Sequence, residues 1–400
     1  MEDFNKYYKE TQRQNNVEKL SDMPDTSELP EKKRGGLDLP LFILVVVLLT
    51  VGVIMVLSAS FARAYYEGGN PTYIFSRQLI FAIAGVVVML VVSKIRVSVF
   101  RKWSGIALLV SIALLALVLI IGIVGGGSRR WINLGFTTFQ PSEIAKLAVI
   151  LFYAKMICDR SKKQMKSFKQ GILPFGIVAG VIVGLLILEP HLSASIIIIG
   201  ITGIMIIAGG ANLKQIGLMV LAVAVLGAVA VLLLPYAQDR ITGWLHPEND
   251  PLGDGFQILQ SLYAIGSGGL LGVGLGQSRQ KYMYLPEEHN DYIFPIVCEE
   301  LGFIGAVLIL MLFALLIIRC FWIALHAKTK YGSLITTGIA GLLAIQVFLN
   351  VAVVTNLIPS TGISLPFFSY GGTALMIQMM EMGIVLSVSR DIPLKVEDEE

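Results

Sequence analysis

The chain has 400 residues, of which 55% are hydrophobic and 15% are charged, and its mean hydropathy is +0.74. This composition excludes a soluble globular enzyme, which would carry more charge, and a disordered protein, which would carry fewer apolar residues. A net charge of only +3 over the whole chain excludes a nucleic-acid-binding surface.

The first 38 residues are polar and of mixed charge, and they contain no short apolar segment of the kind that a signal peptide needs. We therefore expect residues 1–38 to form a disordered tail. The cysteines Cys158, Cys298 and Cys320 are odd in number and lie in or at the ends of predicted helices. They predict no disulfide framework.

Ten apolar stretches follow this tail, each close to the roughly 20 residues that a helix needs to cross a bilayer. They cover residues 39–59, 78–93, 104–124, 142–158, 173–189, 193–209, 217–235, 293–318, 333–354 and 373–389. Their apolar runs are unbroken, whereas the strands of an outer-membrane barrel alternate polar and apolar residues. The sequence therefore predicts an all-α polytopic membrane protein, with a bundle of ten transmembrane helices over residues 39–389.

Ten spans place both ends of the chain on the same side of the membrane. The segments on that side carry 19 Lys and Arg residues against 7 on the other, and positive residues favour the cytoplasmic side. We therefore expect the N-terminal tail and an acidic tail over residues 390–400 to be cytoplasmic. Residues 236–291, between the seventh and eighth helices, form a long extracellular loop in this topology, and long ordered loops usually carry function.

Basic residues on the outer side run against the topological bias, and two groups of them lie beside glycine-rich backbone. Arg129 and Arg130 follow a triple glycine and precede Trp131, while Arg279 and Lys281 lie in the stretch GLGQSRQK. Guanidinium groups beside flexible backbone suit an anionic ligand. The alternative is that Arg and Trp side chains anchor helix ends at the membrane interface.

Ionisable residues inside apolar spans are costly and therefore candidates for function. Glu143 and Lys146 are three residues apart on one helix face, where they either neutralise one another or line a polar cavity. The other carboxylates in or near spans are Glu189, Glu299, Glu300 and Glu381. For each of these residues, structural pairing is the alternative to a functional role.

The strongest single candidate is Asp291, in YLPEEHNDYIF at the mouth of the predicted eighth span. A carboxylate there is partly desolvated yet reachable from outside, which suits a general base. Its neighbours Glu287, Glu288 and His289 are rival bases or candidate metal ligands. The sequence contains no HExxH, Walker or GxSxG motif, and no metal site is certain.

Four motifs resemble those of the SEDS family, the proteins of shape, elongation, division and sporulation. They are RRWINLGFTTFQPSEIAK at 129–146, QSLYAIGSGGLLGVGLGQSRQK at 260–281, YLPEEHNDYIFPIVCEELGFIG at 284–305 and PSTGISLPFFSYGGT at 359–373. The resemblance covers about residues 37–392. Within the family, GLGQSRQK is more similar to the division protein FtsW and the sporulation protein SpoVE than to the elongation protein RodA.

The resemblance implies a peptidoglycan glycosyltransferase that polymerises lipid II into glycan strands at the outer face of the bacterial cytoplasmic membrane, during cell division or sporulation. The family's key aspartate falls on Asp291, which we expect to be the general base of an inverting reaction. Its PSE motif and the following lysine fall on residues 141–143 and Lys146, and its arginine–tryptophan pair on Arg130 and Trp131. The expected substrate-binding residues are Arg129, Arg130, Trp131, Glu143, Lys146, Arg279, Lys281, His289 and Ser369.

The resemblance also implies partners: a cognate class B penicillin-binding protein as transpeptidase, and other division proteins. No cofactor is certain, and a divalent cation, Mg²⁺ or Mn²⁺, is left open as a stabiliser of pyrophosphate charge. Two alternatives to a polymerase are kept. One is a lipid II flippase, suggested by the intramembrane charges, and the other is a non-catalytic division scaffold.

Some positions depart from the family pattern. Asn290 and Tyr292 flank the key aspartate in place of the family's Thr and Phe, and both changes are mild. A PDLG-like motif reads PHLS at residues 190–193, so an acidic role cannot be carried over to His191.

Overall fold

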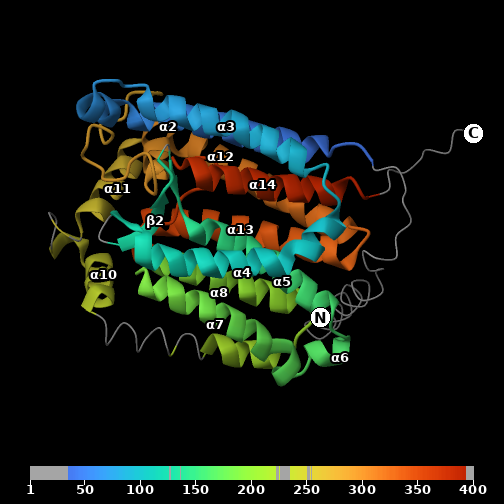
Figure 1. The fold of residues 1–400 in the computed structure, drawn as a ribbon. Helices are drawn as coiled ribbons and strands as arrows, with labels where there is room; N and C mark the ends of the chain where they lie inside the picture. The colour runs from blue at the N-terminus through green and yellow to red at the C-terminus, as the bar shows by residue number, and fades with distance from the viewer. Residues whose placement is uncertain are drawn as a thin grey trace, which may run out of the picture.

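The structure, a computed structural model, describes residues 35–125, 128–135, 137–221, 225, 235–249, 253 and 255–392. Nine long helices in these ranges lie side by side in one bundle (Figure 1). They are α2 (Leu39–Gly68), α3 (Tyr73–Val92), α4 (Val97–Ile121), α5 (Pro141–Cys158), α7 (Leu173–Leu188), α8 (Leu192–Ala208), α12 (Ile293–His326), α13 (Lys330–Val354) and α14 (Gly372–Ser389).

These helices fall on nine of the ten predicted spans, while the predicted seventh span, residues 217–235, lies largely outside the described residues. Seven helical stretches among the described residues are long and apolar enough to cross a membrane. The other two helices are α8, which has 17 residues, and α5, which carries three charged side chains within 18 residues. The prediction of a helical membrane protein is confirmed at this level.

The two ends of the described chain meet at one end of the bundle. Helix α2 begins at a capped turn, where the Asp38 carboxylate accepts from the Leu41 N–H at 3.0 Å. The Gly35 N–H donates to the Arg390 carbonyl at 2.8 Å, directly after α14. Helices α10 (Pro235–Leu245) and α11 (Phe256–Ser267) lie at the opposite end of the bundle, and strand β2 (Ser128–Asn133) lies at that end too (Figure 1).

Helix α12 is broken at Gly302, whose backbone has φ 67° and ψ −173°. A Cβ at Gly302 would lie 2.2 Å from the Gly272 nitrogen, so only glycine fits this crossing. The segment 268–274 packs into the break and satisfies the freed backbone groups. The Val273 N–H donates to the Glu299 carbonyl at 2.9 Å, and the Phe303 N–H donates to the Gly269 carbonyl at 2.9 Å.

The prediction of an all-α fold is incomplete. Strands β1 (Ile123–Gly125), β2 and β3 (Thr138–Phe139) form a small antiparallel sheet in the order β1-β2-β3. The predicted extracellular loop over residues 236–291 also holds regular structure, namely α10, the 3₁₀ turn η2 (Pro247–Asn249) and α11. Each of these elements is shorter than the window in which a membrane span is recognised, so average hydropathy could not reveal them.

Candidate functional site

A polar cavity of about 710 Å³ opens where β2, the first turns of α5 and α14, and the loops before α8, α12 and α14 meet. Six of the predicted site residues line it: Arg130, Trp131, Glu143, Lys146, Asp291 and Ser369. They come from three motifs that lie far apart in the sequence. The fold therefore brings the strongest sequence candidates into one space.

Asp291 lies two residues before α12 and is held there through its backbone. The Asn350 side chain of α13 donates to the Asp291 carbonyl at 2.8 Å and to the Ile363 carbonyl at 2.6 Å. A single buried amide thus joins the segment before α12 to the segment before α14. Because both segments line the cavity, Asn350 determines how they sit relative to one another.

The residues on either side of Asp291 are fixed in the same way. The Ser369 hydroxyl donates to the Asn290 carbonyl at 2.8 Å, and the Tyr370 N–H donates to the His289 carbonyl at 2.8 Å. The Tyr292 hydroxyl donates to Ser360 Oγ at 3.1 Å. Residues 289–292 form no regular hydrogen-bonded element, so these long-range bonds define the place of the Asp291 carboxylate.

The electrostatic surroundings of Asp291 favour a base of intermediate strength. Burial raises the pKa of Asp291 to about 6, and the negative charges of Glu287 and Glu143 act in the same direction. Arg130 and His289 oppose this rise. A carboxylate with a pKa near 6 is ionised at neutral pH and accepts a proton more readily than an ordinary aspartate.

Arg130 is the predicted outer cation that the fold places in the cavity. It extends from β2 next to Trp131, and its guanidinium donates to the Pro190 carbonyl. Arg77 of α3 lines the same cavity. Arg129, which alternates with Arg130 along the strand, is exposed and is not among the lining residues.

Glu143 and Lys146 form the ion pair that their spacing predicted. Lys146 Nζ lies 2.8 Å from the Glu143 carboxylate, and the two side chains are only 4% and 9% exposed, Lys146 and Glu143 respectively. Both residues also line the cavity. The two side chains therefore neutralise one another and also form part of the polar wall of the cavity.

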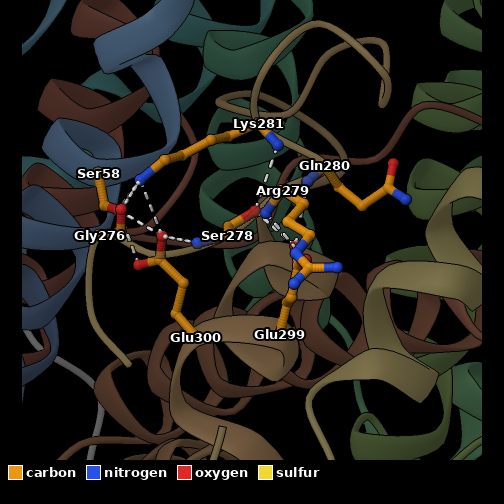
Figure 2. Close-up of polar contacts among 8 residues, drawn as sticks. All are labelled: Ser58, Gly276, Ser278, Arg279, Gln280, Lys281, Glu299 and Glu300. Atoms are coloured by element: carbon orange, nitrogen blue, oxygen red, sulfur yellow. Dashed lines mark hydrogen bonds and ion pairs between the residues drawn. The ribbon is translucent and has the colours of Figure 1, made fainter. Parts of the chain in front are cut away.

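Besides Arg129, three more predicted substrate-binding residues lie outside the lining. Arg279 is exposed, whereas Lys281 is buried and lies 3.2 Å from Glu300. Figure 2 shows that the Lys281 side chain points to Ser58 and Glu300 rather than toward open space. His289 is buried beside Glu288, and its ring lies against that of Tyr370.

The rival bases of Asp291 separate in the structure. Glu288 is fully buried and bound to Arg63, so it does not face the cavity. Glu287 is exposed and lines the cavity, and it accepts from the Asn290 side chain at 2.5 Å. Within the described part of the chain, no three His, Cys, Asp or Glu side chains are arranged to hold a metal ion.

Sequence reasoning missed several residues of the site. Asn350 is a buried polar residue in an apolar span, and that contrast was a usable signal. Arg77 was one of the seven outer cations but has no glycine-rich neighbour. Gly362 has a φ of +64°, and a Cβ built on it would lie 3.0 Å from Asp291 Oδ2. No local pattern could have revealed that contact.

Comparison with known proteins places the chain in a family. A family model for the cell cycle proteins FtsW, RodA and SpoVE matches residues 39–392. Stage V sporulation protein E of Bacillus subtilis is 45% identical over 362 residues, which cover 90% of this chain and 98% of that protein. A probable peptidoglycan glycosyltransferase FtsW of Trichlorobacter lovleyi is 41% identical over 362 residues, covering 89% of this chain and 94% of that protein.

Solved structures agree with this assignment. One chain, from work on the structural coordination of polymerization and crosslinking by a peptidoglycan synthase complex, matches with a TM-score of 0.74 and 30% identity. That match covers 89% of this chain and 98% of that one. The crystal structure of the rod shape determining protein RodA of Thermus thermophilus matches with a TM-score of 0.66 and 26% identity, covering 90% and 98%. The predicted likeness to SpoVE and FtsW is confirmed, and the chain belongs to the FtsW/RodA/SpoVE family of cell cycle proteins.

Proposed function

We propose that this protein is a peptidoglycan glycosyltransferase that polymerises lipid II at the outer face of the cytoplasmic membrane. Its relatives in the family are named for that transferase activity, and a structural match comes from a peptidoglycan synthase complex. The observation that carries the proposal is the cavity in which Asp291, Arg130 and the Glu143–Lys146 pair meet. Such a cavity supplies a base and cations to a membrane-embedded anionic substrate.

In the proposed reaction, Asp291 takes the proton from the 4-hydroxyl of the acceptor's terminal N-acetylglucosamine. The resulting oxygen nucleophile attacks the anomeric carbon of the donor's N-acetylmuramic acid, and the configuration at that carbon is inverted. The bond to the pyrophosphate-linked lipid breaks in the same step. Pyrophosphate is a good leaving group, so the reaction requires no general acid.

We assign the cation that stabilises the leaving pyrophosphate to Arg130, with Arg77 as a second donor that lines the same cavity. Arg279 and Lys281 receive no such role, because Arg279 is exposed away from the lining and Lys281 is held by Glu300. Ser369 and His289 support the reaction by holding the backbone around Asp291, and Ser369 also lines the cavity.

The proposed topology has ten spans, cytoplasmic termini and an extracellular segment over residues 236–291 that leads to Asp291. Two facts support it: the described chain starts and stops at one end of the bundle, and Asp291 lies near the other end, just before α12. As partners we propose a cognate class B penicillin-binding protein and other division proteins. Residues 1–34 and 393–400, which include most of the predicted tails, lie outside the described residues.

Polymerisation of fluorescent lipid II by the purified full chain with its transpeptidase partner tests the function. We expect gel-resolved glycan strands both with the active partner and with a partner whose transpeptidase serine is replaced. Translocation of lipid II across vesicles without polymer would instead support a flippase. If a monodisperse complex gives neither polymer nor translocation, the result would support the scaffold function.

Gly362→Ala is expected to lower the polymerisation rate roughly 10- to 100-fold, because a misplacement of about 1 Å at a reacting group has that cost. The added Cβ would lie 3.0 Å from Asp291 Oδ2, and the φ of +64° resists any L side chain. The initial rate of strand formation measures the effect.

The matched control for this variant is Gly69→Ala. Gly69 has a φ of +67°, so alanine meets the same backbone strain, but nothing lies within 4 Å of its Cβ position. Gly69→Ala should therefore retain the wild-type rate at equal yield of folded protein. Equal losses of rate in the two variants would contradict a specific contact with Asp291.

The rate of polymerisation should depend on pH through Asp291. The reaction needs the ionised carboxylate, whose pKa is about 6, so the rate should be constant above that pH and fall on acidification. Well below pH 6, the ionised fraction and the rate should each drop about tenfold per pH unit. Initial rates from about pH 4 to about pH 8 measure this limb, and a rate that rises on acidification would contradict the base assignment.

A further inference from the structure

A second ion pair joins the segment that carries the proposed base to helix α2, the first transmembrane helix. Arg63, in the last turns of α2, donates from Nε to Glu288 Oε1 at 2.8 Å and from Nη2 to Glu288 Oε2 at 2.9 Å. This is the two-pronged geometry in which an arginine binds a carboxylate most firmly. Glu288 is three residues before Asp291 and is fully buried, and the Arg63 side chain is 22% exposed.

Glu288 is charged in this environment. Burial alone would raise the pKa of Glu288, but the hydrogen bonds and charges of His289 and Arg63 outweigh burial and hold it below its ordinary value. A buried carboxylate that remains ionised needs its cation. The position of Glu288 is therefore coupled to the position of Arg63 on α2.

The same helix also holds the beginning of the segment that leads to Asp291. Five residues upstream of Arg63, the Ser58 hydroxyl donates to the Glu300 carboxylate at 2.6 Å, and Lys281 Nζ lies 3.2 Å from Glu300 (Figure 2). Glu299 accepts from the Ser278 hydroxyl at 2.5 Å and from the Arg279 N–H at 3.0 Å. Helix α2 thus contacts residues 278–291 through two buried polar clusters.

We propose that Arg63 is a positioning residue for the transfer reaction, acting on Asp291 through Glu288. This inference rests on the proposed role of Asp291 as the base. Residues 286–291 form turns rather than a helix or strand, so contacts with other parts of the chain help to fix their position in the cavity. The Arg63–Glu288 pair adds a restraint from α2 to the one that Asn350 supplies from α13.

A purely structural role of the pair would reduce the amount of folded protein without changing the turnover of the folded molecules. A positioning role lowers kcat of the folded protein and leaves the KM for lipid II unchanged, because Glu288 does not line the cavity. In a positioning role, kcat also depends on the geometry of the cation and not only on its charge. Arg63→Lys keeps the charge but loses the second prong, so its kcat should lie between those of the wild type and Arg63→Gln.

The experiment measures kcat and KM of the full chain, with its transpeptidase partner, on fluorescent lipid II, normalised to the monodisperse fraction in size-exclusion chromatography. We expect Arg63→Gln and Glu288→Gln each to lose roughly 10- to 100-fold in kcat. The double variant should lose no more than either single variant, because the pair acts as a unit and no lone buried charge is left.

Glu67→Gln is the matched control. Glu67 also contacts Arg63, at 3.6 Å, but its side chain is 60% exposed, and we expect unchanged kcat and KM. A wild-type kcat in Arg63→Gln, a raised KM at constant kcat, or additive losses in the double variant would each overturn the inference. If Arg63→Gln does not fold, Arg63→Lys and the double variant decide by the same criteria.

Asp291→Asn in the same series separates this inference from the proposed function. An inactive Asp291→Asn with an unimpaired Arg63→Gln would refute the positioning role alone. An active Asp291→Asn would refute the base, and with it the route by which Arg63 acts. Absence of polymer from the unaltered protein would refute the proposed function itself.

Discussion

Asp291→Asn is expected to lower the rate of glycan polymerisation by at least about 100-fold, the usual contribution of a general base. Asparagine has nearly the same shape as aspartate and keeps a hydrogen-bond acceptor, but it cannot take up the proton of the attacking hydroxyl. The backbone bonds that hold this position, from Asn350 and Ser369, do not involve the carboxylate. The variant should therefore fold and insert normally, and its initial rate measures the chemistry alone.

Glu287→Gln is the control for this prediction, because Glu287 is the other carboxylate of the 287–291 stretch that lines the cavity. Glu287 is exposed, whereas Asp291 is half-buried. Loss of its charge should lower the pKa of Asp291, since Glu287 raises that pKa. We expect Glu287→Gln to remain active at neutral pH. If Glu287→Gln is inactive and Asp291→Asn active, the two roles are reversed.

The parts of the fold that follow from local physics were predictable. An apolar run long enough to cross a bilayer predicts a span wherever it occurs, and the ends of α13 and α14 lie within about three residues of the expected ones. Asp291 could be found because a carboxylate at the edge of an apolar span is costly. The Glu143–Lys146 pair followed from its spacing on one helix.

The parts that depend on partners far away in the chain were not predictable. Lys281 was expected to bind the substrate because it is a cation on the outer side, yet Glu300 and Ser58, the latter 223 residues away, surround it. Arg63 and Glu288 are 225 residues apart, and Glu288 was considered as a rival base rather than as the counter-ion of Arg63. The sequence shows where a charged side chain would be costly to bury, but its counter-ion can be identified only from the packed structure.

The short elements were missed for a related reason. β1 and β3 have three and two residues, and they exist because β2 pairs with both of them. The break in α12 depends on Gly302, which in the sequence is one glycine among 40. Its role follows from the backbone of residues 268–274 that passes beside it, and no pattern around Gly302 encodes that contact.

Lys146→Met is expected to destabilise the folded protein by about 3 to 5 kcal/mol, the cost of leaving a buried charge without its partner. Lys146 is 2.8 Å from Glu143, and it also interacts electrostatically with Glu381 of α14. All three side chains are buried. Removing the lysine therefore leaves the buried Glu143 carboxylate without its counter-charge, and methionine fills the space without replacing that charge.

Glu143→Gln should cost much less, about 1 to 2 kcal/mol, because Lys146 keeps Glu381 as its counter-charge and glutamine still offers an oxygen as hydrogen-bond acceptor. The double variant leaves a single carboxylate and should lie between the two single variants. SDS titration in mixed micelles measures the free energy of unfolding of all three proteins. Equal losses of unfolding free energy in the two single variants would show that Glu381 does not act as a second counter-charge for Lys146. The predicted asymmetry arises because one buried cation serves two helices, α5 and α14, that both line the cavity.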